Sequence, residues 1–168
     1  MKKILSFLFI LFVIAAPNTY AENTHNDYLS TPTSGEQSDS ETYGEGNIRY
    51  EIKNFSSQAS YKHLKDGYSY IENNGNGTVH VSGYTSSYST SDVIGITLYL
   101  QRWDSNRGQW ADVANLGDTS RPNASFVAAG KDVTIVKGYY YRTRAVHWVT
   151  KSGVLEKANS LTTYIHIK

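Results

Sequence analysis

The sequence contains no cysteine among its 168 residues. The chain therefore forms no disulfide, offers no thiolate ligand to a metal ion, and carries no lipobox cysteine to which a lipid could be attached. A domain without disulfides relies on its apolar core for stability, and a domain well above about 80 residues can bury enough apolar surface to do so. We therefore expect an ordinary packed core.

Methionine and proline are also scarce, with one and three residues, whereas tyrosine and tryptophan number 14 and three. Strands favour aromatic and β-branched side chains, because these pack well on a pleated surface. The body of the chain shows no helical periodicity in its apolar residues. Together, these features predict an all-β protein.

One long apolar run is present, and it lies at the N-terminus. Ile4 to Ala16 is uninterrupted, with Lys2 and Lys3 before it and Pro17 after it. Thr19 to Ala21 then offers small residues at the two positions that a signal peptidase reads. The run is shorter than the roughly 20 apolar residues of a membrane-spanning helix. We predict a signal peptide over 1–21 and a mature chain that is secreted, extracellular or loosely envelope-associated, with no membrane span.

Charge is unevenly distributed along the rest of the chain. Residues 22–46 carry six acidic residues and no lysine or arginine, so we expect a disordered acidic linker there. Residues 47–168 hold 14 basic and nine acidic residues, a net charge of +5, and are predicted to form one domain. The linker is either a solvated spacer or an acidic arm that shields the basic domain.

Alternation of apolar and polar residues predicts strands throughout that domain. The alternation is clearest where Ile94, Ile96, Leu98 and Leu100 share one parity. Asn and Gly at 73–77 predict a hairpin loop. We expect strands at 47–55, 68–72, 78–84, 94–100, 110–116, 125–128, 132–136, 139–150 and 160–167, with turns or loops at 104–109, 121–123 and 151–153. Seven or more short strands predict a sandwich or barrel.

Gly138 to His147, followed by Gly153 and Ser160, resembles the penultimate strand, last turn and last strand of fibronectin type III domains. Ile96 to Arg102 is similar to their third strand. The resemblance covers about 93–168 and implies a single antiparallel β-sandwich of the fibronectin type III or immunoglobulin-like kind. As a whole, the chain resembles small secreted proteins of Bacillus-like bacteria that form a domain-of-unknown-function family. That second resemblance implies secretion and no chemistry.

The same parities define an outer face, because side chains alternate along a strand. With Ile94, Ile96, Leu98 and Leu100 inward, Tyr99 and Trp103 point outward. Trp103 and Trp110 are then cross-strand partners beside a turn. In the fibronectin-like register, Tyr139, Tyr141, Thr143 and Ala145 point inward. On the last strand, Leu161, Ile165 and Ile167 point inward, which leaves Thr162 outside.

In a fibronectin-like sandwich these three strands share one sheet. Its outer face would then be a candidate interaction face, composed of Tyr99, Trp103, Trp110, Tyr140, Arg142, Arg144, Trp148, Tyr164 and His166. Exposed aromatic patches mark interaction sites, and Tyr, Trp and Arg anchor interfaces. The alternative is that these side chains only support the sheet, stack on the arginines, or are covered by N-terminal strands.

The sequence carries no catalytic, cofactor or metal-binding motif. It has no Gly-x-Ser-x-Gly elbow, and its acidic residues are scattered near turns rather than paired. The five histidines lack chelating spacing, although a metal site formed across strands by His147 and His166 is conceivable. Arg142 and Arg144 are too few to form a basic stripe for nucleic acid.

The favoured hypothesis is therefore a secreted, non-enzymatic β-sandwich that uses this face to bind a cell-wall glycan, an anionic wall polymer or another protein. Two alternatives remain open. The chain is a secreted enzyme whose site is assembled only in the fold, or it is a self-assembling matrix component. No cofactor is expected under the favoured hypothesis.

The first prediction concerns processing. Cleavage after Ala21 should release a mature protein that begins at Glu22 and accumulates in the culture supernatant. N-terminal sequencing of the secreted and membrane fractions tests this. An intact N-terminus at Met1, recovered from membranes, would contradict it.

Overall fold

The computed structural model describes residues 43–48 and 61–168. The predicted signal peptide, the linker up to residue 42 and most of the predicted strand 47–55 lie outside the described residues. Across these two ranges, no helix is long and apolar enough to cross a membrane. The strands are β1 (Tyr43–Asn47), β2 (Leu64–Asn73), β3 (Thr78–Asp104), β4 (Gln109–Thr134), β5 (Tyr139–Lys151), β6 (Val154–Leu161) and β7 (Ile165–Ile167).

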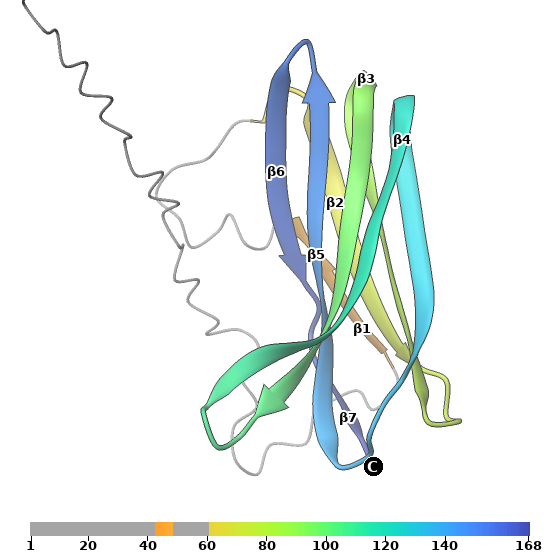
Figure 1. The fold of residues 1–168 in the computed structure, drawn as a ribbon, viewed down its shortest axis with the longest axis vertical. Helices are drawn as coiled ribbons and strands as arrows, with labels where there is room; N and C mark the ends of the chain where they lie inside the picture. The colour runs from red at the N-terminus through yellow and green to blue at the C-terminus, as the bar shows by residue number, and fades with distance from the viewer. Residues whose placement is uncertain (1–42, 49–60) are drawn as a thin grey trace, which may run out of the picture.

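Strands β3 and β4 are long, and each contributes one half to each of two layers (Figure 1). The first half of β3 pairs with β2 on one side and with the second half of β4 on the other. The second half of β3 pairs with the first half of β4 and with β5. A register shift between Ser86 and Ser91 separates the two halves. The antiparallel sheet therefore curls on itself into a sandwich, which confirms the predicted all-β fold class.

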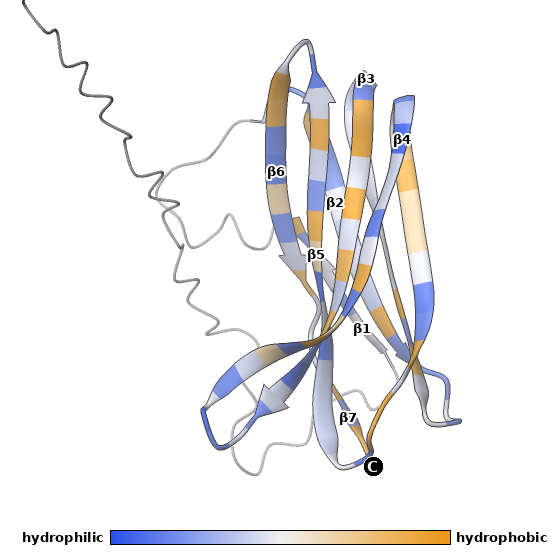
Figure 2. Ribbon diagram, in the orientation of Figure 1, coloured by the Kyte–Doolittle hydropathy of each residue, from blue (hydrophilic) through white to orange (hydrophobic). Residues whose placement is uncertain are grey.

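The core lies between the two layers and follows the predicted alternation. Ile94, Ile96, Leu98 and Leu100 are all buried. They pack with apolar side chains from β2, the first half of β3, β5 and β7 in one cluster. Figure 2 shows the corresponding alternation of apolar and polar residues along β3 and β5. The hairpin loop at 73–77 and the turn near 104–109 are also confirmed.

A carboxylate fastens the beginning of β2 to β6. The side chain of Glu156 accepts hydrogen bonds from the backbone N–H groups of Lys62, His63 and Leu64, at 2.9, 2.9 and 2.7 Å. Partial burial raises the pKa of the Glu156 carboxyl, but these three donors outweigh it and hold the pKa below its ordinary value. The Glu156 carboxylate therefore links β6 to the beginning of β2, which belongs to the opposite layer.

The loop predicted at 121–123 is wrong, because these residues continue β4. Pro122 lies opposite Val93, and Arg121 lies opposite Ile94. In the described sheet β4 pairs with β3 alone, and an edge strand tolerates proline, which lacks an N–H group. Asn123, with φ of 50°, supplies the local irregularity that the sequence pattern suggested. The short strands predicted at 110–116, 125–128 and 132–136 therefore belong mainly to one strand.

The single last strand predicted at 160–167 is divided into β6 and β7, and its parity at the start is inverted. Leu161 pairs with the outward Arg144, whereas Thr162 is buried. The backbone N–H of Thr143 donates to Thr162 Oγ1 at 3.0 Å. Where β6 ends, the Thr162 hydroxyl therefore accepts the hydrogen bond that a backbone carbonyl would accept in a regular strand pair. For this contact the side chain of Thr162 points inward.

Two other expectations need adjustment. Strand β1 begins at Tyr43, so residues 43–46 of the segment assigned to the linker belong to the sheet. Tyr139, expected inside, is 40% exposed at the end of β5, where its ring contacts the guanidinium of Arg102. The three strands expected to share one layer do so, because β5 pairs with β3, β6 and β7.

The core assignment yields the second prediction. Leu98 is 2% exposed, so Leu98→Ala should lower the free energy of unfolding by about 2–5 kcal/mol, as truncation of a buried leucine does. Leu155 is 54% exposed, and Leu155→Ala is the matched control, with an expected change within about 0.5 kcal/mol. Urea unfolding of both variants tests this. Equal stability of the two variants would contradict the assignment.

Candidate functional site

The outer side of the layer formed by β5, β6, β7 and the adjoining halves of β3 and β4 carries the residues singled out in the sequence. We call it the tryptophan face, defined by Tyr99, Trp103, Trp110, Tyr140, Arg142, Arg144, Trp148, Tyr164 and His166. Cross-strand partners project to the same side of a sheet, and the partners here include Tyr99 with Arg144, Trp103 with Trp110, and Tyr140 with His166. The structure therefore brings the predicted set onto one face.

Five of these rings form a connected cluster. Trp103 and Trp110 meet edge to face at 5.5 Å, and Trp110 lies 6.1 Å from Tyr164. Tyr140 lies 5.5 Å from Tyr164 and 4.4 Å from His166. Trp103 and Trp110 lie on the β3–β4 hairpin, which twists away from the body (Figure 1). Tyr140 lies on β5, His166 on β7 and Tyr164 just before β7. The cluster joins this hairpin to the sheet.

Arg142 was expected to be an exposed cation, and this is wrong. Its side chain lies on the outer side of β5 but is covered, with 2% of the residue exposed. The guanidinium lies 4.4 Å from the ring centre of Trp110, and its Nε donates to Gln101 Oε1 at 2.7 Å. Trp110 thus covers a guanidinium that is already hydrogen-bonded, and Arg142 supports the indole instead of presenting charge.

Arg144 remains partly accessible, but its charge is paired. Its Nη2 lies 2.5 Å from Asp112 Oδ2, and its guanidinium lies 3.8 Å from the ring centre of Tyr99. Gln101 Nε2 donates to the same carboxylate at 2.8 Å. Farther along β3, Thr97 Oγ1 donates to Asp118 Oδ1 at 2.5 Å. These two separate hydrogen-bonded groups, which we call the polar row, follow the aromatic cluster along the sheet.

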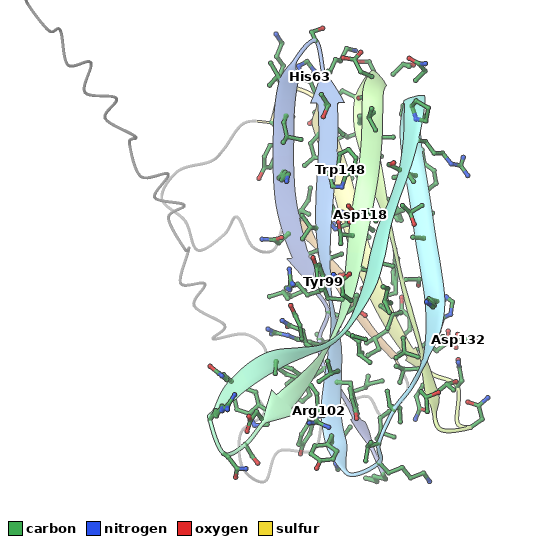
Figure 3. All side chains as sticks on the ribbon, in the orientation of Figure 1. His63, Tyr99, Arg102, Asp118, Asp132 and Trp148 are labelled. Carbon is green, nitrogen blue, oxygen red and sulfur yellow. The ribbon has the colours of Figure 1, made fainter. Side chains whose placement is uncertain are left out.

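Trp148 lies on the same side of the sheet, toward the opposite end of β5 from the cluster. Figure 3 shows Trp148, Asp118 and Tyr99 in succession along this side. Trp148 is the cross-strand partner of Gly95, and a Cβ at Gly95 would lie 2.1 Å from its indole. The indole therefore rests directly on the backbone of β3, which is possible only because residue 95 has no side chain.

The other layer has a second aromatic surface that the sequence analysis missed. We call it the tyrosine face, and it consists of Tyr43, Tyr68, Tyr70, Tyr84 and Phe126. Tyr68 stacks on Tyr84 at 5.0 Å and on Tyr70 at 6.4 Å. Tyr84 lies 5.4 Å from Phe126, and Tyr43 lies 6.2 Å from Tyr70. A hairpin closed at 73–77 fixes this register, so the loop was the signal that could have revealed it.

Carboxylates surround the tyrosine face. Glu45 is the cross-strand partner of Tyr70, and Glu72 is that of Tyr43. Burial raises the pKa of the Tyr70 hydroxyl, and the charge of Glu45 raises it further. Asp132 lies on the same side, where its Oδ1 is 2.7 Å from His80 Nδ1. This face therefore differs from the tryptophan face in both ring packing and charge.

His147, considered above as a metal ligand, lies in the core. Its Nδ1 is 2.9 Å from Thr85 Oγ1, and its Nε2 is 2.8 Å from Ser160 Oγ. Thr85 Oγ1 also donates to the carbonyl of Gly95, and Ser160 Oγ donates to Ser69 Oγ, so the imidazole belongs to a hydrogen-bonded network inside the core. Although a serine and a histidine lie within hydrogen-bond distance, both residues are 0% exposed, and the pair is structural.

The structure does not support a metal site formed across strands by His147 and His166. His147 faces the core, whereas His166 stacks on Tyr140 on the tryptophan face. Among residues 43–48 and 61–168, no group of three or more His, Asp or Glu side chains is placed to hold a metal ion.

Comparisons with family models, with curated proteins and with solved structures found no match to this chain.

The buried histidine yields the third prediction. Burial lowers the pKa of His147 to about 3, so the native state keeps it neutral while the unfolded chain protonates it below about 6.5. Its contribution to stability is complete above pH 6.5 and falls as the pH drops toward 3. We expect a loss of about 2 kcal/mol between pH 7 and 5.

Urea unfolding at several pH values measures this loss. His147→Asn is the control, because it retains the other histidines and should be less stable at pH 7 but lack this part of the slope. Equal slopes in the two proteins between pH 7 and 5 would contradict the assignment.

Proposed function

We propose that this chain is a secreted, non-enzymatic binding module that acts outside the cell or loosely at its envelope, with the tryptophan face as its binding surface. The predicted signal peptide supports the location. The structural support is the joint placement of the five-ring cluster, the polar row and Trp148 on one outer side of a sheet.

This arrangement suits recognition because the side chains are ordered before a ligand arrives. Trp110 rests on Arg142, Trp148 rests on Gly95, and Arg144 is held by Asp112. Rings fixed in this way lose little conformational entropy on binding, so more of the contact energy is retained as affinity. Surfaces rich in Tyr, Trp and Arg also supply most interface anchors.

A self-assembling component is the second candidate, and the tyrosine face is the observation that favours it. Its outermost rings are well exposed, with Phe126 at 49% and Tyr43 at 44%. A chain with aromatic surfaces on both outer sides could associate with further copies of itself. A rise in mass with protein concentration, abolished by Phe126→Ala, is the result that would favour this candidate.

The fourth prediction tests the binding surface. Trp103→Ala and Trp148→Ala should each reduce retention on purified cell wall at least several-fold, because a stacked aromatic side chain contributes about 1–3 kcal/mol to such contacts. Phe126→Ala is the matched control, since it removes an exposed ring from the opposite face and should leave retention unchanged. Thermal melting of each variant verifies folding. Both tryptophan variants binding like the parent, or both losing several kcal/mol of stability, would contradict the proposal.

A further inference from the structure

We propose that the second half of β4 is a docking edge, at which two copies of this chain pair as antiparallel strands to form a closed dimer. The inference does not depend on the proposed function, and it concerns the backbone edge of the sheet instead of its aromatic faces. Three observations carry it: the free backbone groups of this edge, the state of the other edges, and a register in which the edge complements itself.

In the second half of β4, every other residue turns its backbone N–H and C=O away from β3. The N–H of Ile135 donates to the carbonyl of Gly77 at 3.0 Å, and the register continues without a shift from Thr134 to Phe126. Hydrogen-bonded pairs alternate with non-bonded pairs in an antiparallel ladder, so the odd-numbered residues of this stretch bond to β3. The even-numbered residues direct their backbone groups to the side where the described sheet has no further strand, and all of them are exposed: Phe126, Ala128, Gly130, Asp132 and Thr134.

The other edges of the described sheet are closed or interrupted. Strand β1 contacts β6 of the opposite layer, and just after β6 the N–H of Thr163 donates to the carbonyl of Glu45 at 3.1 Å. In the first half of β4 the register shifts twice, Pro122 has no N–H group, and Asn123 has a positive φ. Prolines and irregularities of this kind prevent an edge from pairing with another strand. The second half of β4 carries neither, so it is the regular edge.

Charge favours one antiparallel register for a second copy, with Ala128 at its centre. The charged residues of this edge, Lys131 and Asp132, are adjacent and lie near one end, so antiparallel pairing separates them from those of the second copy. Lys131 has the core-facing parity, and a lysine placed in this way disfavours any register that covers it. Pairing about Ala128 sets Lys131 opposite the exposed Ser125 and Asp132 opposite Ala124, so no like charges face each other.

The same register is two-fold symmetric and sterically open. Ala128 faces Ala128 of the second copy, and Phe126 faces Gly130, so a large ring meets a residue without a side chain. The paired residues are the even-numbered ones, whose N–H and C=O groups are directed to the open side. A contact between identical edges occupies both of them, so association ends at two copies. Because the symmetry axis is perpendicular to the shared layer, the tryptophan faces of both copies lie on one side of the dimer.

The experiment measures the mass of the predicted mature chain, residues 22–168, by sedimentation over a wide range of protein concentrations. Ala128→Pro removes an outward N–H group and no bond to β3, and an edge strand tolerates proline at such a position. Thr134→Pro is the matched control, because it removes an outward N–H group beyond the paired stretch. Ala128→Lys and Thr134→Lys are a second matched pair, which gives the result if a proline variant fails to fold. Thermal melting verifies the fold of each variant.

We expect the mass to rise with concentration from that of one chain to that of two, and no further. Ala128→Pro and Ala128→Lys should each weaken dimerisation at least about tenfold. The first removes two symmetry-related hydrogen bonds, and the second sets like charges directly opposite each other. Both Thr134 variants should dimerise as the parent does. Phe126→Ala should do so as well, because it leaves the backbone of the edge intact.

A thiol at the symmetry axis tests the register. The Cα atoms of a hydrogen-bonded antiparallel pair are about 5.5 Å apart, within the range of roughly 4.4–6.8 Å that a disulfide spans. The chain has no cysteine, so Ala128→Cys introduces a single thiol, and mild oxidation of this variant should yield a covalent dimer. Thr134→Cys, beyond the paired stretch, should yield much less.

Three results would overturn the inference. The first is the mass of a single chain at every concentration. The second is a dimer that both Ala128→Pro and Ala128→Lys leave intact, or equal cross-linking of the two cysteine variants. The third is association that continues beyond two copies and is abolished by Phe126→Ala, which assigns the contact to the tyrosine face. Retention on cell wall is a separate measurement, so failure of the dimer and failure of the proposed function are distinguishable.

Discussion

The continuity of β3 across both layers is the constraint on which the remaining structure depends. Within each layer β3 buries side chains of one parity, and the buried parity changes from odd to even across the register shift between Ser86 and Ser91. The buried side chains include Val79 and Val81 in the first layer, and Ile96 and Leu98 in the second. Because β3 pairs with β2, β4 and β5, its alternation in each layer fixes which of their side chains lie on that layer's outer face.

The sequence was informative where one side of a strand is buried. The period-2 pattern through Leu98 and Leu100 identified the core and its opposite face, because burial on one side leaves a repeating signal in composition. It was uninformative at Pro122, where a residue typical of loops is compatible with an edge strand. It also gave no sign of the break after β6, where a hydroxyl of Thr162 replaces a backbone acceptor. A side chain that replaces a backbone hydrogen-bond partner at one position does not change the period-2 pattern of the sequence.

The sequence predicted which side chains lie on the candidate face, but it did not predict how far each of them is exposed to solvent. Parity placed Arg142 on the correct side, but its burial depends on Trp110, which comes from another strand and covers it. The resting place of Trp148 likewise depends on the missing side chain at Gly95. These contacts join residues far apart in the sequence, and neither composition nor periodicity encodes them. The tyrosine face needed only the hairpin register, so its omission was avoidable.

The two aromatic surfaces differ in which part of each ring is left for a partner. In the tyrosine face, Tyr68 stacks on both Tyr70 and Tyr84, with interplanar angles of 12° and 23°. Stacking of this kind uses the ring faces for contacts among the tyrosines themselves, and the Tyr68–Tyr84 contact stabilises the pairing of β2 with β3. In the tryptophan face, the indole of Trp110 packs on the guanidinium of Arg142, and the indole of Trp148 packs on the backbone at Gly95. The indoles of the tryptophan face are therefore fixed by groups within the sheet, which is why we propose the binding role for this face and not for the tyrosine face.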